Sequence, residues 1–442
     1  MNSGELVRTI GLPTATFIII GYVVGASIFI LPGTLAGDLG PAVFLAYALA
    51  AVPAVIAGFV MAQIGSALPI SGANFVLVRD GLSPLAGFIY VWIMISMAAV
   101  VIPMLAIGFA DYFTHFVPGI DRTLLASGVV ICFILLNSLG VSVAAVTQNV
   151  LVFVFLLALL IFGLGGVTMG NTSLLDPLFP QGLSMLGLAA ITAFFSYAGV
   201  FVIVEIAGEI KNPGKNIPLA ILYSFIVIIM LYMLVPLAMN MLVPWQELGL
   251  SDRAVVTAAE VFMPDFMVTF VAVSALFAAA TSVNGIMLGL SRDFFQGARS
   301  GLFPVIFARV QRGTHVPLGA VLMMGVLALT GIQIGAAITS YAQLSLIGLM
   351  IIQILTGLAL LRLPKIMPDA FAQAKFRMGN RLLPVICILY ILFSIGFLIV
   401  LSLEKPMLLL IGVSYLLLGL IYLWAWKRFV NPGTQQSGIS GE

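Results

Sequence analysis

The distribution of apolar residues constrains this chain of 442 residues more than any motif does. Hydrophobic residues make up 62% of the sequence and charged residues only 8%, against about 25% charged in ordinary soluble domains. The apolar residues form blocks of about 17 to 30, the length that a helix needs to cross a bilayer. The sequence therefore predicts an all-α membrane protein and excludes a soluble multidomain one.

We count twelve such blocks, at 11–36, 41–68, 83–113, 123–139, 145–167, 183–208, 218–243, 266–295, 317–335, 339–362, 383–402 and 406–426. Twelve membrane helices follow, with the fourth and fifth the least clearly separated. The first 13 residues lack a basic segment ahead of a short apolar one, so we expect no cleaved leader.

The basic residues predict the orientation. An even number of spans puts both termini on one side of the membrane, and 15 of the 18 Lys and Arg residues fall on that side. The positive-inside rule then predicts cytoplasmic N- and C-termini in a multi-pass protein of the plasma (cytoplasmic) membrane. No basic face of the kind that binds nucleic acid is present, so the expected partners are the lipid bilayer and a small-molecule substrate.

Two small-residue interruptions predict an internal repeat. One lies at 21–29 in the first span and the other at 196–199 in the sixth. Gly-interrupted spans at matching positions of two halves are typical of inverted-repeat transporters with a binding site at mid-membrane. We therefore expect a five-plus-five inverted repeat with broken first and sixth helices, followed by two extra helices. The predicted units are 1–10 (cytoplasmic), 11–168 and 183–362 (five-helix repeats), 363–382 (amphipathic cytoplasmic linker), 383–426 (helices eleven and twelve) and 427–442 (cytoplasmic tail).

The first-span interruption is a candidate substrate site. If the helix unwinds between Val24 and Ile28, the N–H groups of Ala26, Ser27 and Ile28 face a cavity and bind an anion such as a carboxylate. The alternative is close helix packing through Gly21 and Gly25. The matching interruption in the sixth span favours a site at Val24, Gly25, Ala26, Ser27 and Ile28.

The sixth span supplies the other half of this candidate site, at Phe195, Ser196, Ala198, Gly199 and Phe201. Phe195 is expected to form a pocket wall or a gate over bound solute. The alternative is that the aromatic residues of this span only pack against neighbouring helices.

Glu205 lies on the same span, six residues past Gly199, or about 9 Å along a helix. A charge at this depth is costly, so a functional Glu205 is either a proton carrier or the counter-charge for a cationic group. The alternative is a protonated side chain bonded between helices. Glu209 is expected to form an ion-paired helix end and turn at the cytoplasmic side together with Lys211, Asn212, Pro213 and Lys215. Arg292 and Asp293 are expected to form a similar pair at the end of the eighth span, and such pairs can also lock a gate.

A sodium site is a further candidate. The hydroxyls of Thr281 and Ser282 and the carbonyls of Gly21, Val24 and Ala278 would supply the oxygen ligands that a hard cation prefers. The alternative is that the two hydroxyls bond to their own helix. Neither a metal cluster nor a nucleophile–base pair is evident, so no cofactor and no enzyme is predicted. A channel is disfavoured because no continuous polar stripe is evident.

Four motifs, in order along the chain, carry a resemblance to the amino acid–polyamine–organocation superfamily of transporters. They are Gly21 to Phe29 with Pro32-Gly33; Pro69 to Ala73; Phe195 to Gly199 running through Glu209 to Pro213; and Asn284, Ser291-Arg292 and Gly301 to Pro304. The resemblance covers nearly the whole chain. It implies a five-plus-five fold in which the backbone at 24–28 and 195–199 binds the α-carboxylate and α-amino groups.

Two departures from the superfamily bear on this expectation. Many members have a lysine in the fifth helix where this chain has Phe155, and an acidic residue where it has Phe201. The expected function is secondary transport of amino acids with neutral or hydrophobic side chains, by alternating access. The alternative is an amine, polyamine or cationic amino acid carrier that uses Glu205. Coupling to H⁺ or Na⁺, simple exchange and the oligomeric state stay open.

Overall fold

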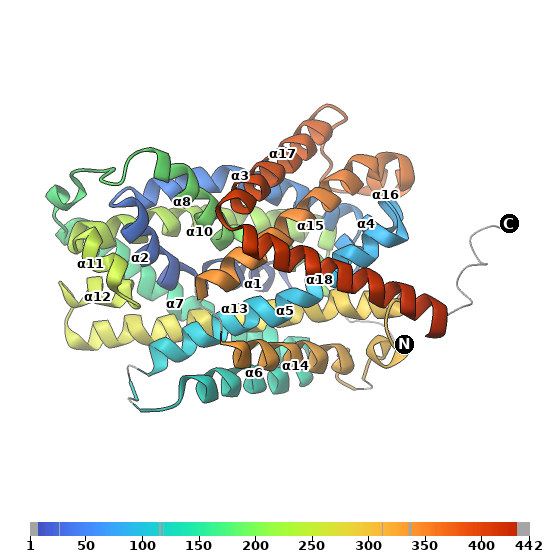
Figure 1. Ribbon diagram of the computed structural model, residues 1–442, viewed down its shortest axis with the longest axis horizontal. Coiled ribbons are helices and arrows are strands. Elements are labelled where there is room, and N and C mark those ends of the chain that lie inside the picture. The colour runs from blue at the N-terminus through green and yellow to red at the C-terminus, as the bar shows by residue number, and fades with distance from the viewer. Residues whose placement is uncertain are drawn as a thin grey trace.

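The computed structural model describes residues 8–25, 27–114, 116–117, 119–311, 313–335 and 338–430. These residues form a bundle of helices (Figure 1). Within them the structure has no sheet, and the one extended pairing is an isolated bridge between Ile10 and Ile210. The all-α prediction is confirmed. The predicted site residue Ala26 and most of the tail 427–442 lie outside the described residues.

Ten helical segments of the described chain are long and apolar enough to cross a membrane, and two shorter apolar helices accompany them. The protein is therefore a multi-pass membrane protein with about ten to twelve long apolar helices. The spanning helices are α1 (Leu12–Val24) with α2 (Ser27–Leu39), α3 (Val43–Ala67), α5 (Pro84–Phe113), α6 (Arg122–Ser138), α7 (Val141–Met169), α8 (Ser184–Phe194) with α9 (Val202–Glu205), α10 (Pro213–Leu242), α13 (Asp265–Arg299), α14 (Leu318–Ile334), α15 (Ile338–Ile366), α17 (Leu382–Glu404) and α18 (Pro406–Ala425).

Short helices lie in the connections: α4 (Ala73–Gly81), α11 (Trp245–Leu250), α12 (Ala254–Glu260) and α16 (Pro368–Gln373). Local signals explain several boundaries. Ser83 precedes α5 and its hydroxyl accepts from the Ala86 N–H at 3.1 Å, with a proline in the first turn, which is the usual pattern of a helix start. Gly140 separates α6 from α7 at φ 121°, a conformation that favours glycine.

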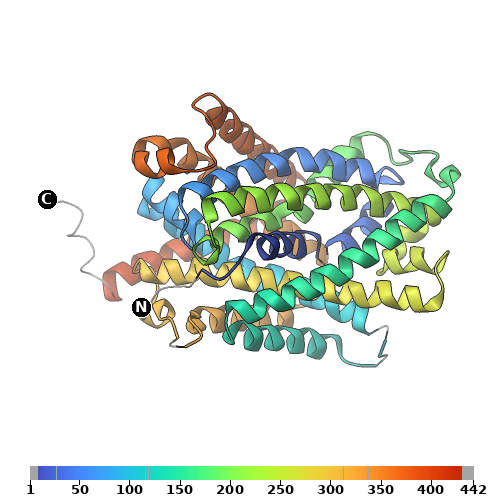
Figure 2. The same cartoon turned by 180° about the vertical axis from the view of Figure 1, so that it is seen from behind.

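The helix α1 lies in the middle of the bundle (Figures 1 and 2). It packs against α10, α13, α7 and the segment Phe195–Phe201. By contrast, α17 and α18 lie on the outside, where only 22% and 11% of their most apolar windows are buried, against 78% for α5. The interrupted spans are therefore held in the protein interior, and the last two helices meet lipid.

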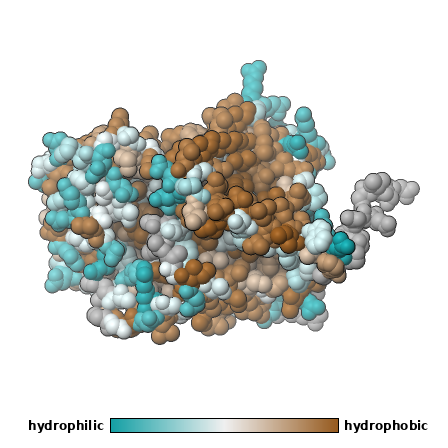
Figure 3. Space-filling view, in the orientation of Figure 1, coloured by the Kyte–Doolittle hydropathy of each residue, from teal (hydrophilic) through white to brown (hydrophobic). Residues whose placement is uncertain are grey.

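The surface divides into an apolar middle and polar ends (Figure 3). The described ends of the chain lie at one end of the bundle: Arg8 donates to the Pro69 carbonyl, and Trp426 donates to that of Gly301. We call this the terminal end. An even number of crossings follows from this arrangement. The helices α11 and α12 lie at the opposite end, on the left of Figure 1.

Candidate functional site

The first-span interruption is present but shorter than predicted. The helix α1 ends at Val24, Gly25 turns at φ 19° and ψ −137°, and α2 begins at Ser27. Ser27 and Ile28 are therefore helical, contrary to the expectation of unwinding through Ile28. The Ser27 hydroxyl lies 3.1 Å from the carbonyls of both Val23 and Val24. It can thus donate a hydrogen bond to one of the carbonyls that have no helical partner because α1 ends there.

The sixth span differs from the prediction in kind. After α8 the chain continues as a 3₁₀ helix, Phe195–Phe201, and returns to the α form in α9. The expectation of a non-helical segment there is therefore wrong. The helical ladder ends further along, at Ile206 with φ −102° and ψ 14°. The 3₁₀ segment packs closely on α1, because a Cβ on Gly199 would lie 2.4 Å from the Tyr22 ring.

A cavity of about 90 Å³ lies between these two spans and α5, α13 and α15. This exceeds the roughly 10–15 Å³ that one water molecule requires. Six of the predicted site residues line it: Ser27, Phe195, Ser196, Ala198, Gly199 and Phe201. Val24, Gly25 and Ile28 are buried but are not among the lining residues. The cavity is thus lined by the five residues predicted on the sixth span and by one residue predicted on the first span, Ser27.

Gly25 has a packing role. A Cβ at this position would lie 1.6 Å from the Ser282 hydroxyl oxygen of α13 and 2.8 Å from the Gly21 carbonyl. No side chain fits there without backbone movement. The close-packing alternative is therefore realised at Gly25, and the cavity begins beside it, at Val23 and Ser27.

Three other helices contribute lining residues that the sequence reasoning missed. The lining residues on each helix are spaced by three or four positions and so share one face. They are Met94, Met97, Val101 and Leu105 of α5; Ile286 and Leu290 of α13; and Ser345, Leu349 and Ile352 of α15. Apart from Ser345, a hydroxyl in an apolar span, no signal distinguishes these residues from ordinary packing residues.

Tyr232 of α10 connects the two interrupted spans and was not predicted. Its hydroxyl lies 2.5 Å from the Val23 carbonyl, 2.8 Å from the Ser196 carbonyl and 2.9 Å from the Ser27 hydroxyl. A phenol has one proton to donate, so Tyr232 donates to one carbonyl and can accept from Ser27. Three segments are held together at this oxygen, directly behind the cavity wall.

Phe195 separates the cavity from a second one. The second cavity, of about 220 Å³, is lined on the side away from the terminal end by residues that include Asp38, Glu404 and Lys405. Phe195 lines both cavities and is partly exposed. A side chain in this position is a wall between two spaces.

Towards the terminal end the cavity is bounded by a polar cluster, comprising Asn74, Tyr90, Glu205, Glu209, Arg292 and Asp293. All six are buried. The Glu205 Oε1 atom accepts from Asn74 Nδ2 and from Tyr90 Oη, the latter at 3.1 Å. Arg292 Nε donates to Glu209 Oε1 at 2.9 Å, with side chains 0% and 1% exposed. Arg292 thus pairs across the bundle with Glu209.

The predicted sodium ligands meet only in part. The Thr281 hydroxyl lies 3.0 Å from the Gly21 carbonyl and 2.7 Å from the Ala278 carbonyl, and the Ser282 hydroxyl lies 3.4 Å from the Gly21 carbonyl. The Val24 carbonyl instead takes the Ser27 hydroxyl. In the described structure the hydroxyls of Thr281 and Ser282 are therefore hydrogen-bonded to helix carbonyls.

An amide chain lies beside Gly21. Asn137 donates to Asn284 at 2.9 Å, and Asn284 donates to Gln148 of α7 at 3.1 Å. A Cβ on Gly21 would lie 2.3 Å from Gln148 Nε2. The helix α7 therefore brings an amide, Gln148, to the side of Gly21, and Phe155 of the same helix is a buried apolar residue.

Comparison with known proteins gives a consistent result. The amino acid permease family matches residues 10–424. The chain is 26% identical to the branched-chain amino acid permease BcaP of Bacillus subtilis (strain 168), over 89% of each chain. It is 27% identical to the methylthioribose transporter of the same organism, over 74% of this chain and 75% of that one.

A human relative is named for a further class of substrate, the large neutral amino acids. The large neutral amino acids transporter small subunit 2 is 29% identical over 94% of this chain and 79% of its own length. The matched region includes both interrupted spans and the polar cluster. The chain belongs to the amino acid permease family of the amino acid–polyamine–organocation superfamily, and it is a transporter, not an enzyme.

Proposed function

We propose that this protein is a secondary transporter of amino acids with neutral or hydrophobic side chains. The observation that carries the proposal is the chemistry of the cavity wall. Its lining residues are apolar except for Tyr22 and the hydroxyls of Ser27, Ser196, Ser282 and Ser345. A charged substrate side chain would have no opposite charge there, and an unpaired buried charge is costly.

The α-carboxylate and α-amino groups need polar partners, which the interrupted spans supply. The start of α2 at Ser27 offers backbone N–H groups and the positive end of a 13-residue helix, an arrangement suited to a carboxylate. Carbonyls at the end of α1 and along the 3₁₀ segment Phe195–Phe201 suit an ammonium group. Val24, Gly25, Ala26 and Ile28 would act through their backbone.

Alternating access follows from a five-plus-five inverted repeat, 11–168 and 183–362, with the cavity between the interrupted helices. In the described conformation the polar cluster closes the terminal end, which the positive-inside rule places in the cytoplasm. Phe195 separates the cavity from the space at the opposite end. Rearrangement of these two barriers in turn would expose the cavity to either side.

The amine or cationic amino acid alternative has less support. It requires Glu205 as a counter-charge in contact with substrate. Glu205 is not among the cavity-lining residues, and its Oε1 atom accepts from Asn74 and Tyr90.

Uptake of a panel of labelled amino acids into proteoliposomes, with imposed H⁺ or Na⁺ gradients, tests the proposal. We expect saturable exchange of branched or aromatic neutral amino acids, and no competition by arginine, glutamate or a carboxylate-free polyamine. Transport of the polyamine in preference to every neutral amino acid would support the alternative.

A further inference from the structure

A pair of buried acidic side chains lies beyond the substrate cavity, and the proposed function makes no use of it. Glu205 of α9 and Asp293 of α13 are 2% and 0% exposed. The helices that carry them, α9 and α13, pack against each other, and the two carboxyl groups are close enough to interact directly. Ionised carboxylates only accept hydrogen bonds, so a bond between two of them requires one proton.

We propose that Glu205 and Asp293 form one proton-binding site, in which Asp293 carries the proton and Glu205 accepts its hydrogen bond. This inference rests on the proposed transport function and adds the ion that drives it. The assignment within the pair follows from the other hydrogen bonds. Glu205 Oε1 accepts from Asn74 and Tyr90, and donors of this kind favour an ionised carboxylate.

Asp293 lacks such donors. Among the described residues, neither of its oxygens has a conventional hydrogen-bond donor, and Glu205 Oε2 likewise has none. A proton on one Asp293 oxygen gives that oxygen and Glu205 Oε2 a shared hydrogen bond, because the acid donates to Glu205 Oε2. The loss of that proton would leave two negative charges side by side in a dry interior, which is strongly unfavourable.

Among the residues that the structure describes, the elements around the pair supply no unpaired cation to compensate a second negative charge. Besides Asp293, α13 brings Arg292, which is paired with Glu209 at 2.9 Å. The short helix α4 brings Asn74, and its Arg79 pairs with Asp80 near the surface. The helix α5 brings Tyr90. The helices α1 and α3, which also pack on α9, contain no charged residue.

The position of the pair links it to the cavity and to the barrier at the terminal end. Phe201 and Leu290 line the cavity, and they lie four residues before Glu205 and three before Asp293. Such spacings put residues on one face of a helix, one turn apart. The neighbouring residue Arg292 holds the barrier with Glu209. Opening this barrier would admit water, which takes the proton from Asp293 and leaves a hydrated carboxylate.

Three proteins in proteoliposomes test the site: wild type, Asp293→Asn and the control Asp265→Asn, which changes an exposed acid at the start of the same helix. Asparagine donates to Glu205 as a protonated Asp293 would, but it cannot release a proton. We expect Asp293→Asn to retain exchange of a labelled neutral amino acid at equal pH. We expect its accumulation under an inside-alkaline gradient to fall to the level without a gradient, while Asp265→Asn behaves as wild type.

A measurement without substrate completes the test. Because the exposed acids of the chain also titrate, the infrared pH-difference spectrum of wild type is compared with that of each variant. The wild-type spectrum should contain a carbonyl band of a protonated carboxylic acid that Asp265→Asn retains. This band should be lost in Asp293→Asn and, as a second variant, in Glu205→Gln. Equal pH-driven accumulation in wild type and Asp293→Asn would overturn the proposal, as would exchange by wild type without any pH-driven accumulation, or a carbonyl band that persists in both variants. Failure of wild type to exchange any amino acid would instead contradict the proposed function, and the infrared result would still decide the proton site.

Discussion

The two ends of the cavity between the interrupted spans are built differently. On the side away from the chain ends the barrier includes the ring of Phe195, which lines a space on both sides. On the terminal side it is the polar cluster, in which Arg292 and Glu209 are paired with 0% and 1% exposure. An aromatic side chain can move by a rotamer change. A buried ion pair separates only when water reaches both charges.

This difference suggests a division of roles. The Phe195 barrier would respond to occupancy of the cavity, because the ring contacts the same space as the substrate. The polar cluster would respond to hydration and to proton release. Substitutions in the polar cluster should therefore mainly lower the stability of the protein. Substitutions of Phe195 should mainly lower its affinity for substrate.

The largest effect is expected from Arg292→Met. Removing one partner of a buried ion pair leaves Glu209 uncompensated and should lower the free energy of unfolding by about 3–5 kcal/mol. Arg122→Met is the control, because Arg122 and Asp111 form a more exposed pair, with side chains 52% and 27% exposed, for which about 0–1 kcal/mol is expected. Thermal unfolding in detergent measures both. Equal losses would remove the distinction between the barriers, and Arg292→Met combined with Glu209→Met should recover part of the loss.

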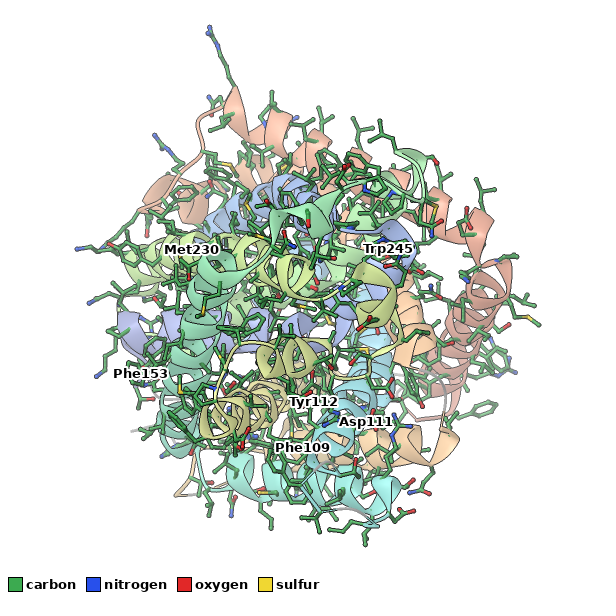
Figure 4. The ribbon with its side chains drawn as sticks, turned by 90° about the vertical axis from the view of Figure 1, so that its left-hand side faces the viewer. Phe109, Asp111, Tyr112, Phe153, Met230 and Trp245 are labelled. Atoms are coloured by element: carbon green, nitrogen blue, oxygen red, sulfur yellow. The ribbon has the colours of Figure 1, made fainter. Side chains whose placement is uncertain are left out.

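Phe195→Ala tests the other barrier. Phe195 is partly exposed in the absence of substrate, and a substrate that covers its ring would gain about 1.5–3 kcal/mol from full burial. We therefore expect substrate affinity to fall roughly 10- to 100-fold with little change in unfolding temperature. Phe153→Ala is the control, since Phe153 lies at the periphery of the bundle (Figure 4) and is 62% exposed. Binding is measured by scintillation proximity. Similar affinities in the two variants would make Phe195 a packing residue.

Tyr232→Phe tests the connection between the interrupted spans. It removes the hydroxyl that meets the carbonyls of Val23 and Ser196. Leaving buried acceptors unpaired should cost about 1–3 kcal/mol of stability and weaken substrate binding as well. Tyr390→Phe is a matched control, because among the described residues the Tyr390 hydroxyl is buried and has no hydrogen-bond partner. An equal loss of stability in both variants would contradict a stabilising role of the Tyr232 hydrogen bonds.

The smallest effect is expected from Thr281→Val. The hydroxyl lies 3.0 Å from the Gly21 carbonyl and 2.7 Å from the Ala278 carbonyl, and loss of its hydrogen bond should cost about 0.5–1.5 kcal/mol. Transport should remain, with the same rate in sodium and in choline buffer. Thr330→Val of α14, whose hydroxyl bonds to its own helix at 2.9 Å, is the control. Sodium-dependent uptake in wild type that is lost in Thr281→Val would assign the coupling to sodium.

Much of the architecture could be predicted from the sequence. The requirement that a spanning helix be long and apolar is local, so blocks of residues predict spans directly. The interruption at Gly25 was also readable, because small residues in mid-span are a local pattern. Its extent was not, since the Ser27 hydroxyl serves the carbonyls that end α1 and allows α2 to begin at once.

The sixth span shows where local patterns are insufficient. Aromatic and small residues around Gly199 predicted unwinding, but the segment keeps a tightened 3₁₀ form against Tyr22. Phe195 was singled out as a candidate wall or gate, which stays a prediction, and its place between two cavities depends on α2, α15 and α17. The lining faces of α5 and α15 carry the same residue types as ordinary packing faces, so no pattern separates them.

The sequence by itself determined that the chain spans a membrane with α-helices, that it belongs to a transporter family, and that Glu205 lies within an apolar span. These properties depend on hydropathy, motif order and position along one span. Only the tertiary structure decided that Asp293 lies against Glu205, that Arg292 pairs with Glu209, and that Tyr232 joins the interrupted spans. Each of these contacts connects residues on different elements. The carbonyls that Tyr232 meets, for example, belong to residues 36 and 209 positions away in the sequence. Such contacts form because buried polar groups need hydrogen-bond partners, and the packing of distant elements decides which partners are near.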